Sequence, residues 1–197
     1  MHRKRAEWAT KQDRGAVIVT VDISEWSLVG LVQRQAADRG DQEYMSFEHG
    51  TLLTYAALDR DSDQIARNLA SLGIGPSDRV IVLVKNRIEF MLAMIGIMKI
   101  GALFVPINTE LKGAFLQHQM RNAEPSAVFL DYDLRDAFDS VDGGNKNLTS
   151  VIYIAGNVPD HRPSILTKAH ALTFEEFLAL EGVGDDVLVE GKPEDIA

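Results

Sequence analysis

The chain has 197 residues, of which 46% are apolar and 25% charged, and it contains no cysteine. This length suits one domain with its own core, and the apolar fraction excludes a wholly disordered chain. The missing cysteines exclude disulfides, thiolate zinc sites and a cysteine nucleophile. A net charge of −9 repels phosphate backbones, so we expect no nucleic-acid partner.

The first fifteen residues are basic, although the chain as a whole is acidic. They hold five Lys and Arg residues against Glu7 and Asp13. These two carboxylates argue against a transit peptide, and no cleavable apolar region follows. We therefore expect a disordered basic leader over residues 1–15, an α/β domain from residue 16 to 197, and a cytoplasmic location.

The next segments favour a helix, a hairpin and a second helix. Apolar residues at helical spacing predict a helix over 25–38 that ends at Gly40, and residues 44–47 and 51–53 are typical of a hairpin. From Tyr55 an apolar residue recurs every three or four positions, which predicts an amphipathic helix. Thr54 can cap that helix, and Gly73 with Pro76 ends it.

Residues 90–107 form an apolar run that contains a single charge, Lys99. The run is long enough for a membrane span. Lys99 at its centre, Gly101 and Pro106 instead favour two short elements, so we expect no membrane span. The preceding residues 79–84 are typical of a strand that helices cover on both faces.

Strands and helices then alternate along the chain, which predicts right-handed crossovers and a mostly parallel sheet flanked by helices. Thr173 and Glu176 form a capping box for a further short helix, and the acidic, Gly-containing residues 182–197 resemble a linker. The predicted helices are 88–99, 112–122 and 134–141, and the predicted strands are 79–84, 102–107, 126–130 and 150–154.

Few residue patterns in the chain suggest chemistry. Asp59, Asp61 and Asp63 alternate like the start of a calcium loop, but the required Gly and Glu are missing, so they are expected on the wet face of a helix. The five histidines do not have metal-ligand spacing, and no Gly-Lys-Ser or Gly-Lys-Thr phosphate loop occurs. We therefore expect no metal-binding residue.

Polar residues that follow two predicted strands are the remaining candidates for ligand contact. Ligands of parallel sheets gather beyond the carboxyl ends of the strands. Residues in these positions more often form turns and caps than bind ligands, and the sequence leaves both roles open. The five residues are Lys85, Asn86, Arg87, Asn108 and Thr109.

Four ordered blocks resemble the beginning of the adenylate-forming (AMP-binding) ligases, which include acyl-CoA synthetases, luciferases and peptide-synthetase adenylation domains. The blocks are LTYAAL (53–58), GIGPSDRV (73–80), NRIEF (86–90) and MKIGALFVPIN (98–108). The wider similarity extends from Ser24 to the C-terminus. Within it, residues 106–111 and 115–119 most resemble carnitine- or crotonobetaine-like CoA ligases.

The resemblance implies a two-step reaction. A small-molecule carboxylate and ATP give an acyl-adenylate, and coenzyme A then takes the acyl group, with Mg²⁺ as the metal. The family's phosphate loop and its later catalytic motifs are absent from the chain. We therefore expect an incomplete N-terminal domain that is inactive alone, binds none of ATP, Mg²⁺ and CoA tightly, and contains no catalytic or cofactor-binding residue.

Two other function classes remain open from the sequence. A non-catalytic binding or interaction module could use the same α/β scaffold. A nucleotide-binding protein of another doubly wound type is less favoured, because no glycine fingerprint follows any predicted strand. The acyl substrate and the oligomeric state are not determined by these residues.

Overall fold

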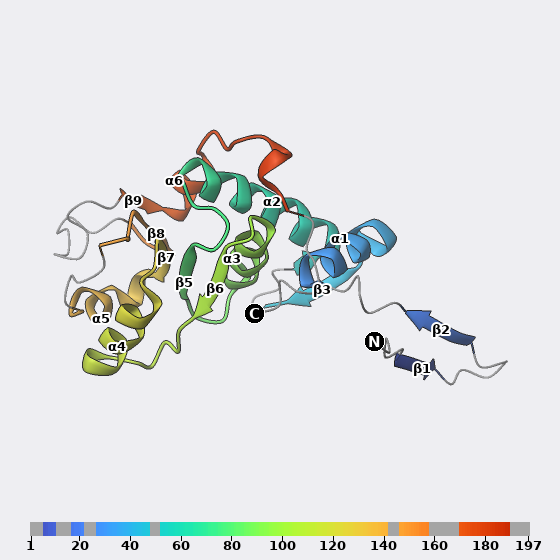
Figure 1. Cartoon of the computed structure of the whole chain (residues 1–197), viewed down its shortest axis with the longest axis horizontal. Helices are drawn as coiled ribbons and strands as arrows, with labels where there is room; N and C mark the ends of the chain where they lie inside the picture. Colours follow the sequence, from blue (N-terminus) through green and yellow to red (C-terminus); the bar gives the residue numbers. More distant parts are fainter. Residues whose placement is uncertain are drawn as a thin grey trace, which may run out of the picture.

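The computed structural model describes residues 6–10, 17–21, 27–47, 52–141, 146–157 and 170–189. Its centre is a five-stranded sheet with strand order β6-β5-β7-β8-β9 (Figure 1). Every neighbouring pair in this sheet is parallel, which confirms the predicted α/β fold. The strands are β5 (Arg79–Leu83), β6 (Leu103–Pro106), β7 (Ala127–Asp131), β8 (Ser150–Ile154) and β9 (His170–Thr173).

The inner strands are apolar because both of their faces are covered. All residues of β7 and β8 are buried, and in β5 only Arg79 is exposed. A strand between two layers of helices has no solvent-facing side, so its sequence does not alternate with polar residues. The edge strand β6 ends at Pro106, as the missing N–H of proline predicts.

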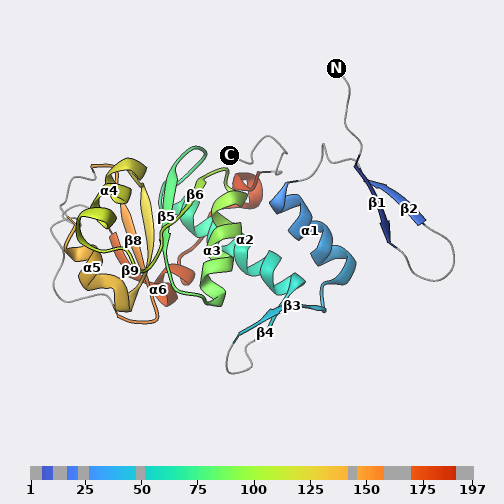
Figure 2. The same ribbon diagram turned by 90° about the horizontal axis from the view of Figure 1, so that it is seen from below.

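Helices cover both faces of the sheet (Figure 2), and a hydrophobic core lies on each face. Val80 and Val82 of β5 belong to the first core, while Ile81 and Leu83 belong to the second. The single sheet therefore joins both cores. The helices of the first core include α2 (Tyr55–Ser71), α3 (Ile88–Lys99) and α6 (Phe174–Leu178). Those of the second core are α4 (Gly113–Ala123) and α5 (Arg135–Asp139), which follows η3 (Tyr132–Leu134).

Two helices, α2 and α6, begin with the side-chain caps that their sequences predict. Thr54 accepts a hydrogen bond from the Ala57 N–H at 3.2 Å, and Thr173 and Glu176 form the expected capping box. These bonds satisfy N–H groups that have no partner inside the helix. The elements that precede α2 are α1 (Leu28–Arg39) and the antiparallel hairpin β3 (Glu43–Ser46) and β4 (Leu52–Thr54).

Helices α2 and α3 pack closely because Gly96 lies at their contact. A Cβ atom at Gly96 would lie 2.7 Å from Ile65 Cγ2 and 2.9 Å from the Ser62 carbonyl oxygen. Both distances are shorter than real Cβ contacts, so the backbone of α3 could not approach α2 this closely with any larger residue.

The charge within α3 is buried at the same contact. Lys99 is 1% exposed, and its Nζ donates to Asp59 Oδ1 at 2.6 Å, to the Asp59 carbonyl oxygen at 2.8 Å and to Asp63 Oδ1 at 2.5 Å. Three acceptors match the three N–H groups of an ammonium. Asp59 and Asp63, expected on the wet face of the helix, are each 26% exposed and also bind Lys99, because their spacing of four residues places both carboxylates beside it. Asp61 instead pairs with exposed Arg60.

Two strands near the start of the chain differ from the expected leader. β1 (Ala6–Thr10) pairs antiparallel with β2 (Val17–Val21), and Ala6 lies opposite Val21. Residues 6–10 are therefore in a strand where a disordered leader was expected. The β-branched run of β2 is a strong strand former and offers β1 an edge. Residues 1–5 and 11–15 of the expected leader lie outside the described residues.

The segment after α6 folds back onto α2 and α3. The buried Asn68 side chain donates from Nδ2 to the Phe177 carbonyl oxygen at 2.8 Å. The Val189 N–H donates to the Lys99 carbonyl oxygen at 2.7 Å, after the 3₁₀ turn η5 (Asp185–Val187). Val187 and Leu188 of the expected linker thus pack against the first core, and residues 190–197 lie outside the described residues.

Candidate functional site

The strand order identifies the carboxyl ends of the central strands as the candidate site. β6, the strand that follows β5 along the chain, lies on one side of β5. The next strand, β7, lies on the other side of β5. The connecting helices α3 and α4 therefore lie on opposite faces. In open parallel sheets, ligands bind beyond the carboxyl ends of the strands where the order reverses in this way. The turns after β5, β6 and β7 thus form the candidate site.

A pocket of about 460 Å³ lies at the carboxyl ends of β5 and β6. Four of the five side chains that the sequence places at this rim line the pocket together: Lys85, Asn86, Asn108 and Thr109. The structure places the fifth, Arg87, beside Asp131 instead. The apolar part of the lining consists of Val84, Phe90, Pro106 and Ile107.

Both rim cations are paired with carboxylates, one from the last residue of β7 and one from the turn that follows it. Lys85 Nζ lies 2.7 Å from Asp133 Oδ2, and Arg87 Nε lies 3.3 Å from Asp131 Oδ2. The hydrogen bond between Lys85 and Asp133 raises the pKa of the ammonium and lowers the pKa of the carboxyl. The charges of Lys85 and Arg87 are therefore largely balanced within the chain.

Asp131 is the buried centre of this arrangement, with 1% of its side chain exposed. Besides Arg87, it accepts longer hydrogen bonds, each of 3.4 Å, from the N–H groups of Lys85 and Asp133. One carboxylate thus joins the turn after β5 to the turn after β7. Because charged hydrogen bonds are stronger than neutral ones, Asp131 fixes the relative position of the two turns.

Sequence reasoning missed Asp131 and Asp133. Both directly follow the strand predicted over 126–130, so the rule that selected Lys85 also applies to them. They meet Lys85 and Arg87 only because β7 lies next to β5, and the sequence pattern does not contain the strand order.

Asn108 acts as a turn residue. Its Oδ1 accepts from the Glu110 N–H at 2.9 Å, and its carbonyl oxygen accepts from the Leu111 N–H at 3.1 Å. An asparagine side chain that binds the backbone two residues later defines an Asx turn. Asn108 therefore shapes the wall of the pocket while its side-chain oxygen is already engaged.

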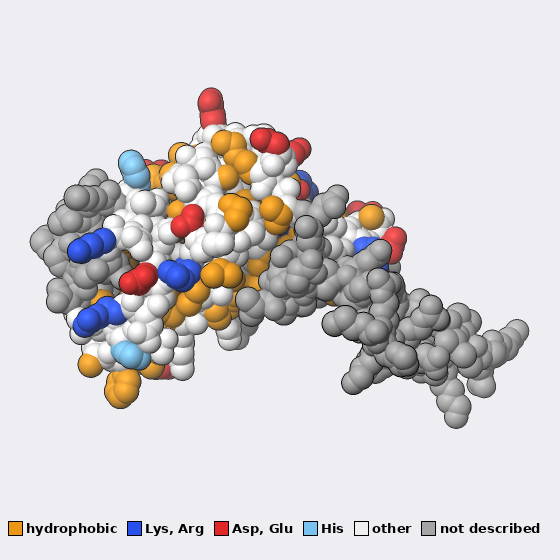
Figure 3. All heavy atoms as spheres, viewed as in Figure 1, with side chains coloured by type: hydrophobic (Ala, Val, Ile, Leu, Met, Phe, Trp, Pro, Cys, Tyr) orange, Lys and Arg blue, Asp and Glu red, His pale blue; other side chains and the backbone are white. Residues whose placement is uncertain are grey.

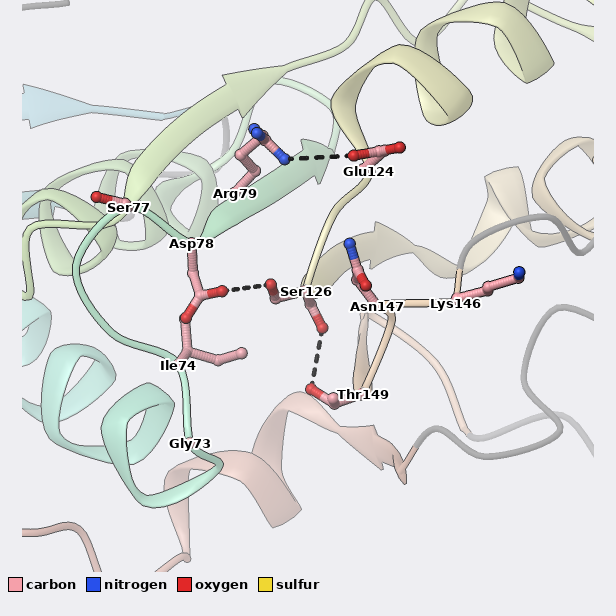
Figure 4. Close-up of a pocket in the computed structure, with 10 residues that line it drawn as sticks. All are labelled: Gly73, Ile74, Ser77, Asp78, Arg79, Glu124, Ser126, Lys146, Asn147 and Thr149. Atoms are coloured by element: carbon pink, nitrogen blue, oxygen red, sulfur yellow. Dashed lines mark hydrogen bonds and ion pairs between the residues drawn. The ribbon is translucent and has the colours of Figure 1, made fainter.

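A second pocket, of about 400 Å³, lies at the opposite ends of the strands, where β5, β7 and β8 begin (Figure 4). There Asp78 accepts from Ser126 Oγ at 2.6 Å and from the Gly75 N–H at 2.9 Å. Thr149 Oγ1 donates to the Ser126 carbonyl oxygen at 3.0 Å. These bonds join the turn over residues 73–80 to the starts of β7 and β8, so we assign this group of side chains a structural role.

Across the ranges that the structure describes, no group of three or more His, Cys, Asp or Glu side chains could hold a metal ion. Within the same ranges, no helix has both the length and the apolar character that crossing a membrane requires. The apolar run over residues 90–107 is instead divided between α3 and β6.

Comparison with known proteins identifies the family. The AMP-binding enzyme family matches residues 32–197. The chain belongs to this family. A medium/long-chain-fatty-acid–CoA/3-oxocholest-4-en-26-oate–CoA ligase of Mycobacterium marinum is 27% identical over 142 residues, which cover 72% of this chain and 24% of that protein. Surfactin synthase subunit 2 of Bacillus subtilis is 25% identical over 156 residues, which cover 68% of this chain and 4% of that protein.

Solved structures of CoA ligases share the fold. The anthranilate CoA ligase AuaEII in complex with anthranoyl-AMP has a TM-score of 0.70 at 19% identity, over 87% of this chain and 31% of that chain. A benzoate CoA ligase from Burkholderia xenovorans has a TM-score of 0.63 at 18% identity, over 80% of this chain and 29% of that chain. The chain spans about a quarter of the length of its Mycobacterium marinum relative.

Proposed function

We propose that the chain is the first section of the large N-terminal domain of an ATP-dependent acyl-CoA ligase. The match of the AMP-binding family to residues 32–197 carries this proposal. The four blocks between residues 53 and 108 lie within this match and occur in the order and spacing of the adenylate-forming ligases. A non-catalytic module on the same scaffold is not favoured, since the similarity covers most of the chain.

The proposed enzyme joins a small carboxylic acid to coenzyme A. The carboxylate attacks the α-phosphate of ATP, which gives an acyl-adenylate and releases pyrophosphate. The thiol of coenzyme A then takes the acyl group and releases AMP. Such a reaction depends on positioning and on stabilising the charge of the phosphates, a task to which Mg²⁺ contributes.

The described residues do not fit ATP or Mg²⁺ by themselves. Lys85 and Arg87, the cations at the candidate site, already balance Asp133 and Asp131. Within the described ranges no cluster of three or more His, Cys, Asp or Glu side chains could hold a metal ion, and the sequence contains no Gly-Lys-Ser or Gly-Lys-Thr loop. We therefore assign no catalytic, cofactor-binding or metal-binding residue to this chain, and we propose that it is inactive alone.

The narrower substrate prediction rests on sequence alone. Residues 106–111 and 115–119 lean towards carnitine- or crotonobetaine-like CoA ligases. The Mycobacterium marinum relative is instead named as a CoA ligase of medium- and long-chain fatty acids and of 3-oxocholest-4-en-26-oate. We propose a small carboxylate as the substrate class and a cytoplasmic location for the enzyme.

Exchange of labelled pyrophosphate into ATP, dependent on an added carboxylate, tests the proposal. We expect no exchange from the 197-residue chain alone. We expect exchange when the chain replaces the 142 matched residues of the Mycobacterium marinum ligase, with fatty acids as the carboxylates. The same ligase without those residues is the negative control. A folded chimera without exchange would contradict the proposed function, and exchange by the chain alone would contradict the proposed inactivity.

A further inference from the structure

The pocket at the amino ends of the strands has a rigid floor. Asp78, Ser126 and Thr149 line it and are held by the hydrogen bonds described above. The Ser126 N–H also donates to the Arg79 carbonyl oxygen at 2.8 Å, and the Thr149 N–H donates to the Ser126 carbonyl oxygen at 2.8 Å. These bonds fix the starts of β5, β7 and β8 relative to one another. A floor held in this way needs little ordering when a ligand binds.

Arg79 and Glu124 lie together at one side of this pocket as a loose ion pair (Figure 4). Arg79 Nη1 is 3.9 Å from Glu124 Oε2, which is too long for a hydrogen bond. The two side chains are 44% and 65% exposed. A guanidinium has several N–H donors and a carboxylate accepts several hydrogen bonds, so both groups keep free capacity for a ligand.

Glu124 occupies a backbone position that suits glycine. It ends α4 with a φ of 44°, in the left-handed region, where a side chain is disfavoured and glycine is the usual residue. Ser77, which also lines the pocket, has a φ of 70°. Two of the three described non-glycine residues with positive φ therefore line this one pocket. Strained positions of this kind cluster at ligand sites.

The charges of the pocket lining balance one another. Arg79 and Lys146 are cationic, and Asp78 and Glu124 are anionic. Figure 3 shows a similar mixture, with acidic and basic side chains interspersed over the part of the molecule that holds the sheet and α4. A phosphate dianion gains little from a neutral site, whereas a ligand with one charge of each sign can pair with both kinds of side chain. Ile74 is the one apolar side chain of the lining, which favours a small polar ligand.

We propose that this pocket is a binding site for a small α-amino acid in its zwitterionic form. The carboxylate of the ligand binds Arg79, and its ammonium binds Glu124. Both charged groups of an α-amino acid are attached to one carbon atom, so the ligand can bridge the 3.9 Å between Nη1 and Oε2 with a charged hydrogen bond of about 2.8 Å at each end. The pocket lies at the opposite ends of the strands from the candidate site, and the inference goes beyond the proposed function.

A titration followed by NMR tests the site on the 197-residue chain. L-Alanine and L-serine are the probes, and acetate, methylammonium, γ-aminobutyrate and inorganic phosphate are the comparison ligands. We expect saturable, millimolar binding of the two α-amino acids. Binding of the other four should be weaker by about tenfold or more, because each lacks one of the charges or holds the two too far apart.

Variants at Glu124 separate binding from folding. Glu124→Gly removes the carboxylate and the strained side chain together, so we expect the melting temperature to rise by roughly 2 to 4 °C. L-Alanine binding should nevertheless weaken by about tenfold or more, and Glu124→Gln should weaken it similarly, since neither variant can pair with the ammonium. Glu110→Gln changes an exposed glutamate after β6 and is the matched control, which should leave the affinity unchanged.

Three results would overturn the inference. The first is the absence of binding by both α-amino acids, and the second is tighter binding of phosphate than of L-alanine, because the site would then recognise an anion. The third is an unchanged affinity for L-alanine in folded Glu124→Gly or Glu124→Gln.

Discussion

Lys99 is a buried ammonium whose hydrogen bonds are all satisfied by one short stretch of α2. Removing an ammonium from water is costly, and the two carboxylates with the Asp59 carbonyl oxygen replace its hydration. Loss of one member of such a group leaves the others without compensation. The position of Lys99 relative to Asp59 and Asp63 therefore fixes how α3 lies along α2.

Lys99→Met tests the energetic role of this group. The substitution keeps the apolar stem but removes the charge, so we expect the free energy of unfolding in urea to fall by roughly 2 to 4 kcal/mol. Adding Asp59→Asn and Asp63→Asn should recover part of the loss, because the two carboxylates then no longer repel each other. The exposed pair Arg60–Asp61 provides the control, and Arg60→Met should cost less than about 0.5 kcal/mol.

Tyr153 is a buried residue whose hydroxyl has no hydrogen-bond partner among the described residues. Burial, with smaller contributions from Asp139 and Tyr132, raises the pKa of Tyr153 from its ordinary value of 10.0 to about 12. Between these two values the unfolded chain has lost the phenolic proton while the folded chain retains it. Folding stability must therefore fall as the pH rises through this window.

Tyr153→Phe removes both the unpaired hydroxyl and the titration. We expect the variant to be about 1 kcal/mol more stable than the wild type at pH 7, because a buried group without a partner is lost. Its advantage should grow by about 2 kcal/mol between pH 9 and pH 12. Urea unfolding at several pH values measures both effects, and a constant difference across that range would contradict the raised pKa.

At the scale of elements, the bounds of α3 and β8 agree with those expected from the sequence. Both are apolar segments with clear ends, and α3 stops before Gly101, which has a positive φ of 68°. The sequence pattern does not show which helices touch. Nothing in the sequence indicates that Gly96 lies at a contact between helices. Only the structure shows that it lies against Ile65 and Ser62.

Gly96→Ala tests the close contact of α2 and α3. Alanine favours the helix by about 1 kcal/mol relative to glycine, whereas overpacking a core costs about 1 to 3 kcal/mol. Because the new Cβ would meet Ile65 and a backbone oxygen, we expect a net loss of roughly 1 to 2 kcal/mol in the free energy of unfolding. Gly75→Ala, where nothing lies within 4 Å, is the control, and an equal loss there would contradict this explanation.

At the scale of the whole molecule, the alternation of strands and helices predicted the parallel sheet and its two covered faces. It did not predict the strand order, because the same alternation is compatible with several orders. The candidate site depends on that order, since Asp131 and Asp133 reach Lys85 and Arg87 only across neighbouring β5 and β7. Residues that follow a strand were therefore predictable, and their partners were not.

Pro106 limits what can be added at the outer edge of β6. The Leu103 and Ile107 N–H groups already donate towards β5, to Asp78 and Val82, so residues 104 and 106 alternate outward. Proline has no N–H, and this leaves Phe104 with the single outward amide of the strand. A neighbouring polypeptide therefore gains little from extending the ladder here and must recognise the edge through its side chains, which also disfavours growth of the sheet into fibrils.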